Sequence, residues 1–122
     1  MTATDPLIAI GQTVQLYFEG MHRGDTQRLR QAFRPDACLD GYYQGEYARL
    51  SLDEWLAEVE GLPKPSEQGE PFDMCIVAID VSGRIAAVKV VVLYLGLRFT
   101  DYLSLVQFEA SWRIVHKAYR HD

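Results

Sequence analysis

The first third of the chain carries apolar residues at the spacing of an amphipathic helix. Three- and four-residue steps make one apolar stripe, formed by Leu7, Ile10, Val14, Tyr17, Phe18 and Met21. Asp5 followed by Pro6 predicts the start of this helix, because Asp caps free backbone N–H groups and Pro suits the first helical position. A short second helix is predicted after Asp25, ending before Pro35. A third opens at the capping box Ser51–Glu54.

The second half of the chain predicts strands. Apolar runs separated by glycine-containing turns indicate strands over residues 72–81, 85–95, 99–108 and 112–119. A shorter extended segment, 38–44, precedes the third helix. Helices in one block and strands in another predict a single α+β domain over residues 1–122, with three N-terminal helices on an antiparallel sheet.

The strand over 85–95 is apolar on both faces, so both faces need cover. The helices can cover one face, and a second copy of the chain is expected to cover the other. This predicts a homodimer through the outer sheet face. A two-residue turn at Gly96 would place Asp101 on the inward face of the sheet. A three-residue turn would instead turn Asp101 outward and bring Thr100, Tyr102 and Ser104 to the inward face. With the two-residue turn, the inward set also contains Val90, Val92, Tyr94 and Leu103.

The last strand is predicted to bury the face that carries Trp112, Ile114, His116 and Ala118. His116 is therefore expected to point toward the helices, and Lys117 away from them. Lys89 interrupts the outer face of its strand and is expected at the edge of the dimer interface, or paired with an acid there.

Composition and charge exclude several classes of function. The 122 residues are 48% hydrophobic and 24% charged, with a net charge of −5, which gives no basic surface for nucleic acid or an anionic membrane. Cys38 and Cys75 form no CxxC motif, and the N-terminus does not resemble a signal peptide, so a reduced, cytoplasmic protein is expected. Motifs of metalloproteases, phosphate loops and serine hydrolases are absent, and neither a metal nor a cofactor is expected.

Two stretches of the chain carry a family resemblance. One runs from Tyr17 to Ala37, and the other joins Ile79–Gly83 to the segments FTDYLSL (99–105) and WRIVHK (112–117). Together they resemble the putative lumazine-binding family of the nuclear-transport-factor-2-like superfamily. The resemblance implies a cone, in which a strongly curved sheet wraps around one long helix and leaves a pocket at its wide end. Most members of that family have no assigned activity.

The same superfamily includes ketosteroid isomerases, cyclases and dehydratases. Val14–Tyr17 resembles the isomerase helix whose tyrosine donates a hydrogen bond to the substrate oxyanion. Counted without gaps from this helix, the position of the isomerase's carboxylate base corresponds to Gly41. The position of its protonated aspartate corresponds to Ser104 or Leu105. Two of the three roles are therefore missing, and steroid isomerisation is not predicted.

The resemblance makes Tyr17, Asp101 and His116 candidates for a hydrogen-bond donor, a carboxylate and a base in the pocket. Each also has a purely structural interpretation. Tyr17 and His116 could be hydrogen-bonded core residues, and Asp101 is more simply placed at the sheet rim, because an unpaired buried carboxylate is unfavourable. The expected ligand-binding residues are Tyr17, Trp55, Val90, Val92, Tyr94, Leu103 and His116.

Three functions remain open from the sequence. The first is a pocket protein that binds a small apolar or aromatic ligand, such as a lumazine or a flavin-like ring. The second is a cofactor-free isomerase, dehydratase or cyclase that uses acid–base residues in the same pocket. The third is a dimeric interaction module whose pocket is filled by Phe18 and Trp55. A tyrosine cluster, Tyr42, Tyr43 and Tyr47, could stack on a planar ring or belong to an ordinary turn.

Overall fold

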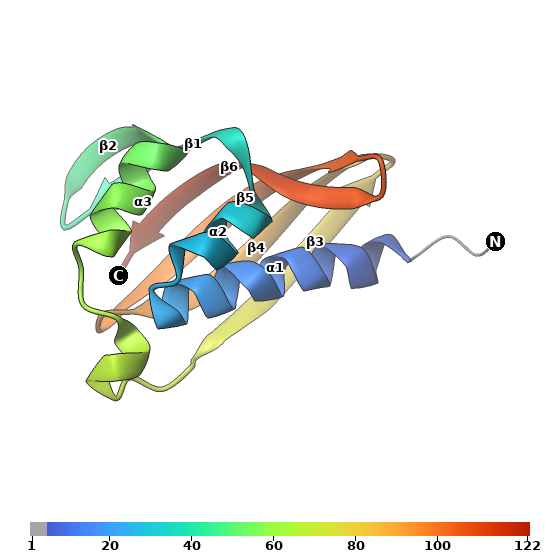
Figure 1. Ribbon diagram of the computed structural model, residues 1–122. Helices are drawn as coiled ribbons and strands as arrows, with labels where there is room; N and C mark the ends of the chain where they lie inside the picture. Colours follow the sequence, from blue (N-terminus) through green and yellow to red (C-terminus); the bar gives the residue numbers. More distant parts are fainter. Residues whose placement is uncertain (1–4) are drawn as a thin grey trace.

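The computed structural model describes residues 5–122 and shows helices packed on one face of a single sheet (Figure 1). The elements in chain order are α1 (Pro6–Arg23), α2 (Thr26–Ala32), β1 (Phe33–Tyr43), β2 (Glu46–Ser51), α3 (Leu52–Glu60), the 3-10 turn η1 (Pro65–Gln68), β3 (Met74–Ser82), β4 (Ile85–Tyr94), β5 (Leu97–Phe108) and β6 (Ser111–His121).

The predicted helix starts are confirmed. The Asp5 carboxylate accepts a hydrogen bond from the Leu7 backbone N–H at 2.9 Å. Ser51 and Glu54 form both halves of the capping box that begins α3. These local signals were sufficient because each cap satisfies backbone N–H groups within the same first turn.

The sheet has six strands in the order β2-β1-β6-β5-β4-β3, and α1 crosses one face of it (Figure 1). The α+β prediction is confirmed, with two differences. β1 and β6 pair in parallel, whereas the other neighbours are antiparallel. The segment 46–51 forms β2, which the sequence analysis did not predict because EYARLS carries no apolar run.

The turn between β4 and β5 fixes which side chains of the two strands face the helices. Tyr94 pairs with Leu97, so the turn contains two residues, and Val90 lies opposite Asp101. The two-residue alternative is therefore correct. Asp101 consequently lies on the buried face of the sheet, with 1% of its surface exposed.

A β-bulge in β6 reverses the expected orientation of the last strand. Ser104 pairs with His116, whereas the next residue of β5 pairs with Ile114, which leaves Val115 as an extra residue. Beyond this bulge, Lys117 faces the helices and His116 faces outward. The prediction that His116 points toward the helices is therefore wrong, because one inserted residue inverts every following side chain.

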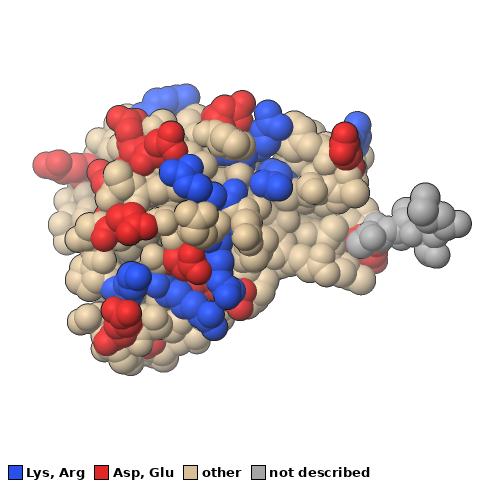
Figure 2. Space-filling view, viewed as in Figure 1, with Lys and Arg blue, Asp and Glu red and all other residues tan. Residues whose placement is uncertain are grey.

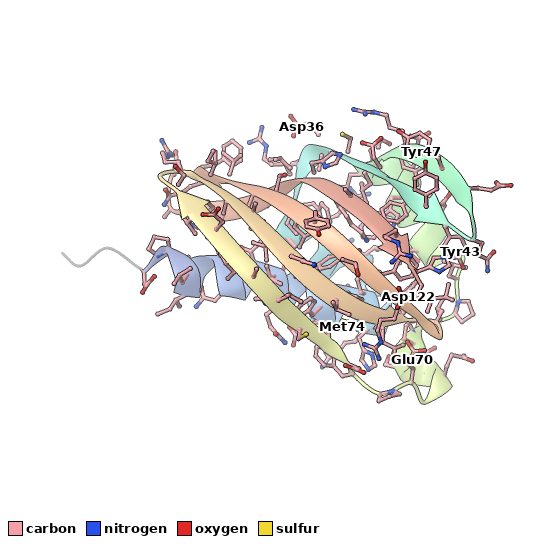
Figure 3. All side chains as sticks on the ribbon, turned by 180° about the vertical axis from the view of Figure 1, so that it is seen from behind. Asp36, Tyr43, Tyr47, Glu70, Met74 and Asp122 are labelled. Carbon is pink, nitrogen blue, oxygen red and sulfur yellow. The ribbon has the colours of Figure 1, made fainter. Side chains whose placement is uncertain are left out.

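Helices leave the outer face of the sheet uncovered, as Figure 3 shows from behind. Lys89 lies on this face, and its Nζ is 5.6 Å from the ring centre of Tyr102. On the opposite, helical side, acidic and basic side chains are intermingled (Figure 2). Within residues 5–122, no helix combines the length and the apolar character needed to cross a membrane.

Candidate functional site

A cavity of about 270 Å³ lies between the sheet, α1, α3 and the β1–β2 hairpin. This volume is slightly below the usual range for ligand sites, about 300–1,000 Å³, which suits a compact molecule better than an extended cofactor. Tyr43 and Tyr47 of the hairpin line the cavity, and Figure 3 shows both at the end of the sheet that carries the hairpin. The lining residues are Tyr17, Met21, Tyr43, Glu46, Tyr47, Ala48, Leu50, Trp55, Glu58, Val59, Leu62, Val92, Tyr94, Phe99, Asp101, Lys117 and Tyr119.

Tyr17 and Asp101 are joined by a short, buried hydrogen bond. The Tyr17 hydroxyl of α1 donates to Asp101 Oδ2 of β5 at 2.5 Å. The other carboxylate oxygen, Oδ1, is buried without a hydrogen-bond partner. Burial raises the pKa of Asp101, and the nearby Lys117 charge and the Tyr17 hydrogen bond oppose that rise. Burial and the Asp101 charge together hold the pKa of Tyr17 well above its usual value, so Tyr17 remains a donor.

Lys117 projects from β6 into the same cavity and is only 4% exposed. Its Nζ lies over aromatic rings, at 4.5 Å from Trp55, 5.0 Å from Tyr17 and 5.3 Å from Tyr119. Among residues 5–122, no carboxylate lies within ion-pair distance of this group. Burial lowers the pKa of Lys117, and the charge of Asp101 partly offsets that effect.

Tyr94, at the end of β4, supplies another unpartnered polar group. Its hydroxyl oxygen is buried and makes no hydrogen bond within the described chain. Burial, with smaller contributions from Tyr43 and Glu70, raises the pKa of Tyr94 to about 12. The group therefore stays a phenol near neutral pH and can donate a hydrogen bond to a ligand oxygen.

Aromatic side chains form much of the cavity wall. Phe99 stacks parallel to Tyr43, with an interplanar angle of 2° and ring centres 6.2 Å apart. Phe99 also meets Tyr94 and Tyr119 edge to face. Such a wall favours an apolar or aromatic ligand, whose polar atoms would meet the few buried polar groups.

The structure brings together most of the residues that the sequence singled out. Those that line the cavity are Tyr17, Trp55, Val92, Tyr94 and Asp101, together with Tyr43 and Tyr47 of the tyrosine cluster. Val90 and Leu103 are buried in the core beside the site but do not line it. Asp101 is not at the sheet rim, so the simpler interpretation of that residue is wrong.

His116 is outside the cavity and takes part in a separate cluster on the outer face. Its Nε2 lies 2.8 Å from Asp40 Oδ2. Suitable ligand atoms of Cys38, Asp40 and His116 lie within 4.8 Å of one another. The Arg49 guanidinium, however, contacts Cys38 Sγ at 3.4 Å and the Asp40 carboxylate at 3.2 Å. A positive charge already pairs with this set, which disfavours a metal cation there.

Lys117 and Tyr119 line the cavity, although the sequence pattern predicts neither as a site residue. Regular alternation along the last strand predicts both on the outer face together with Arg113 and Val115, because the bulge at Val115 has no signature in the segment WRIVHK. The sequence offers one signal for a site residue here, which is the presence of Lys117 in a strand that could bury either face. A lysine alone does not show which face is buried.

The chain is similar to known proteins over nearly its whole length. The chain is 25% identical over 111 residues to "Aldolase FrzH" from Cladobotryum sp., with 91% of this chain and 87% of that protein covered. It is 32% identical to an NTF-2-like protein of unknown function from Silicibacter pomeroyi DSS-3, with both chains fully covered and a TM-score of 0.82. An NTF2-like protein of unknown function from Shewanella baltica OS155 has 24% identity, 98% coverage of both chains and a TM-score of 0.85.

The match to a protein family covers nearly the whole chain. Residues 6–120 match the family described as "putative lumazine-binding". This range includes every residue that lines the cavity. The fold, the solved relatives and this match agree with the resemblance seen in the sequence. The chain belongs to the family described as putative lumazine-binding and has the NTF2-like fold.

Proposed function

We propose that this protein is an enzyme that removes a proton from the carbon next to a carbonyl group of a compact, largely apolar substrate, with Asp101 as the general base. The observation that carries the proposal is the state of its carboxylate. Oδ2 accepts a hydrogen bond from Tyr17, while Oδ1 is buried at the cavity without a partner.

An unpartnered carboxylate oxygen in a protein interior is unfavourable and is uncommon without a functional reason. Here burial also raises the pKa of Asp101, which makes its carboxylate a stronger base than a solvent-exposed one. Tyr17 fixes the orientation of the carboxylate and leaves Oδ1 free to accept a proton. The pair is therefore suited to proton abstraction.

Removal of such a proton leaves negative charge on the carbonyl oxygen. The Tyr94 hydroxyl can donate a hydrogen bond to that oxygen, and the Lys117 side chain supplies positive charge when protonated. Both groups are buried, where their electrostatic effect on a developing charge is larger than in water. The cavity thus contains a base and groups that stabilise the product of its action.

The relative named an aldolase supports this class of chemistry. Aldol reactions begin with the same removal of a proton beside a carbonyl, and so do isomerisations and several cyclisations. At 25% identity, the comparison supports a shared type of step and leaves the substrate of this chain to experiment.

A test uses compact ketones as probes. Purified protein is incubated with phenylacetone or 2-tetralone in D2O, and loss of the proton signal beside the carbonyl is followed by NMR. We expect exchange about tenfold or more above buffer, and background exchange for Asp101→Asn. His116→Ala is the matched control and should exchange like the unmodified protein, because His116 lies outside the cavity. Buffer-level exchange with both ketones, or full activity in Asp101→Asn, would contradict the proposal.

Stoichiometric binding of a planar heterocycle is a second candidate function. The aromatic wall around Tyr43, Tyr94 and Phe99 and the description of the family favour it. Fluorescence titration with riboflavin and a ribityl lumazine tests this alternative. Saturation at one ligand per chain, together with no proton exchange, would favour binding over catalysis.

A further inference from the structure

We propose that Lys117 is a nucleophile that forms a covalent imine with the carbonyl carbon of the substrate. The inference rests on the proposed function, because it assumes a carbonyl compound in the same cavity. It assigns to Lys117 a covalent role, in addition to the proton transfer assigned to Asp101.

The amine of Lys117 is buried at the cavity. Lys117 is 4% exposed, lines the cavity and lies among the rings of Tyr17, Trp55 and Tyr119. A buried lysine normally has a carboxylate partner, and among the described residues this one has none within ion-pair distance. The amine is thus held at the cavity without a structural ion pair that would occupy it.

The amine of Lys117 and the carboxylate of Asp101 come from neighbouring strands. Asp101 pairs with Tyr119, and Lys117 pairs with Leu103, so the two groups occupy diagonal positions on neighbouring strands. Diagonal neighbours on one sheet face are about 7–8 Å apart, within reach of long side chains. A carbonyl carbon bound to Nζ would therefore lie close to the carboxylate that accepts or returns protons.

The protonation state of the Lys117 amine also favours attack on a carbonyl. Only the neutral amine attacks a carbonyl, and burial lowers the pKa of Lys117. In the reaction, a bond forms from Nζ to the carbonyl carbon as the carbonyl π electrons move to oxygen. The carbon–oxygen bond then breaks and the oxygen departs as water. Nζ gives up two protons overall, both of which leave in that water molecule, and Asp101 can carry them.

A proton returned by Asp101 to the imine nitrogen gives an iminium, in which the neighbouring C–H is more acidic, because the positively charged nitrogen accepts the electron pair that remains when the Asp101 carboxylate removes the C–H proton. The product is an enamine, and water later hydrolyses the adduct to release the amine. No oxidant, reductant or cofactor is consumed.

The test is reductive trapping followed by peptide mapping. The protein is incubated with phenylacetone, treated with sodium borohydride and digested, and each lysine peptide is examined for the reduced adduct. The chain contains three lysines, Lys64, Lys89 and Lys117, so the other two are internal controls. We expect labelling at Lys117 about tenfold or more above either control, because the bound ketone is held beside the amine.

Substitutions sharpen the result. Lys117→Met removes the amine, and Lys117→Arg keeps the charge without an amine that forms an imine. Lys89→Met is the matched control on the outer face. Both substitutions at position 117 should abolish the specific adduct, and Lys89→Met should leave it unchanged. The trapping result on the unmodified protein stands even if a substituted protein fails to fold.

The outcomes separate this inference from the proposed function. Labelling no greater at Lys117 than at Lys64 and Lys89 overturns the imine, and Asp101-dependent proton exchange in the same preparation would leave the proposed function standing. Specific labelling of Lys117 with exchange that does not depend on Asp101 supports the imine and overturns the role of Asp101. Absence of both overturns both.

Discussion

Gly41 of β1 lies directly against Tyr119 of β6. The two residues are paired, and a Cβ atom built on Gly41 would stand 2.4 Å from the Tyr119 backbone oxygen and 2.5 Å from its ring. Any side chain at position 41 would therefore push on a residue that lines the cavity. The close approach of the two strands depends on this glycine.

We expect Gly41→Ala to destabilise the protein by about 1–3 kcal/mol, because the extra methyl group forces the strands apart. Gly11→Ala is the matched control. Nothing lies within 4 Å of a Cβ at Gly11, which sits inside α1. Alanine there should stabilise the protein by about 0.5–1 kcal/mol. Urea unfolding of both variants measures the difference, and equal midpoints would contradict the expectation.

Tyr17→Phe removes the donor that faces Asp101 Oδ2. Within the described chain the buried carboxylate would then have no hydrogen-bond partner on either oxygen, so we expect a loss of about 1–3 kcal/mol in stability. The hydrogen bond from Tyr17 lowers the pKa of Asp101, and its loss should therefore raise that pKa further. The rise of proton exchange with pH should begin at higher pH in the variant.

The pH profile of exchange in the unmodified protein and in Tyr17→Phe tests this shift. Tyr102→Phe, on the exposed outer face, is the control and should leave the profile in place. A profile that moves to lower pH in Tyr17→Phe would be inconsistent with the hydrogen bond as the cause.

Asp40 should make folding stability depend on pH in acid. The Tyr47 hydroxyl first, and then His116, lower the pKa of Asp40. Its contribution to stability is therefore fully present above the ordinary pKa of Asp, about 3.9, and is lost as the pH falls through the lowered folded value. We expect Asp40→Asn to be less stable than the unmodified protein near pH 6, and the difference to close in strong acid. Urea unfolding at both pH values measures it, and a constant difference would contradict the assignment.

We propose that the outer sheet face binds a second copy of this chain. Ile85 and Tyr102 lie on this face with 58% and 56% of their surface exposed. Val91 and Leu93 of β4 lie on the same face and are partly exposed. Covering such residues is favourable, and a two-fold axis covers both copies with one surface.

Sedimentation tests the assembly, and we expect a mass of twice 13.9 kDa for the unmodified protein. Ile85→Glu should give the monomer mass. Ile8→Glu is the control, because Ile8 is 59% exposed on α1, away from the sheet face. A monomeric unmodified protein, or equal effects of the two substitutions, would refute the proposed dimer.

Local signals explain what could be predicted from the sequence. The caps at Asp5 and Ser51 act within one helical turn. The sequence left two lengths open for the turn at Gly96, and the pairing of Tyr94 with Leu97 decides between them. The family resemblance supplied the pocket, and Tyr17, Trp55 and Asp101 do line it.

Non-local pairing explains what could not be predicted. The bulge at Val115 arises where β6 pairs with β5, and the neighbouring pairing of β1 with β6 is also irregular, between Phe33 and Cys38. The sequence WRIVHK is compatible with either face because both alternating sets contain apolar and polar residues. The polar segment β2 forms a strand because it pairs with β1. Its own side chains do not predict that pairing.

The bulge has a consequence for how this family can diversify. Between Ile114 and Lys117, the number of residues decides which side chains enter the cavity. A relative that lacks one residue between Ile114 and Lys117 would point the lysine into the cavity from a regular strand. A strand of the present length that paired with β5 without a bulge would point the histidine into the cavity instead. Insertions and deletions in β6 therefore exchange one set of reactive groups for another while the amino acids themselves stay the same, so length variation in this strand is a route to new chemistry in an unchanged fold.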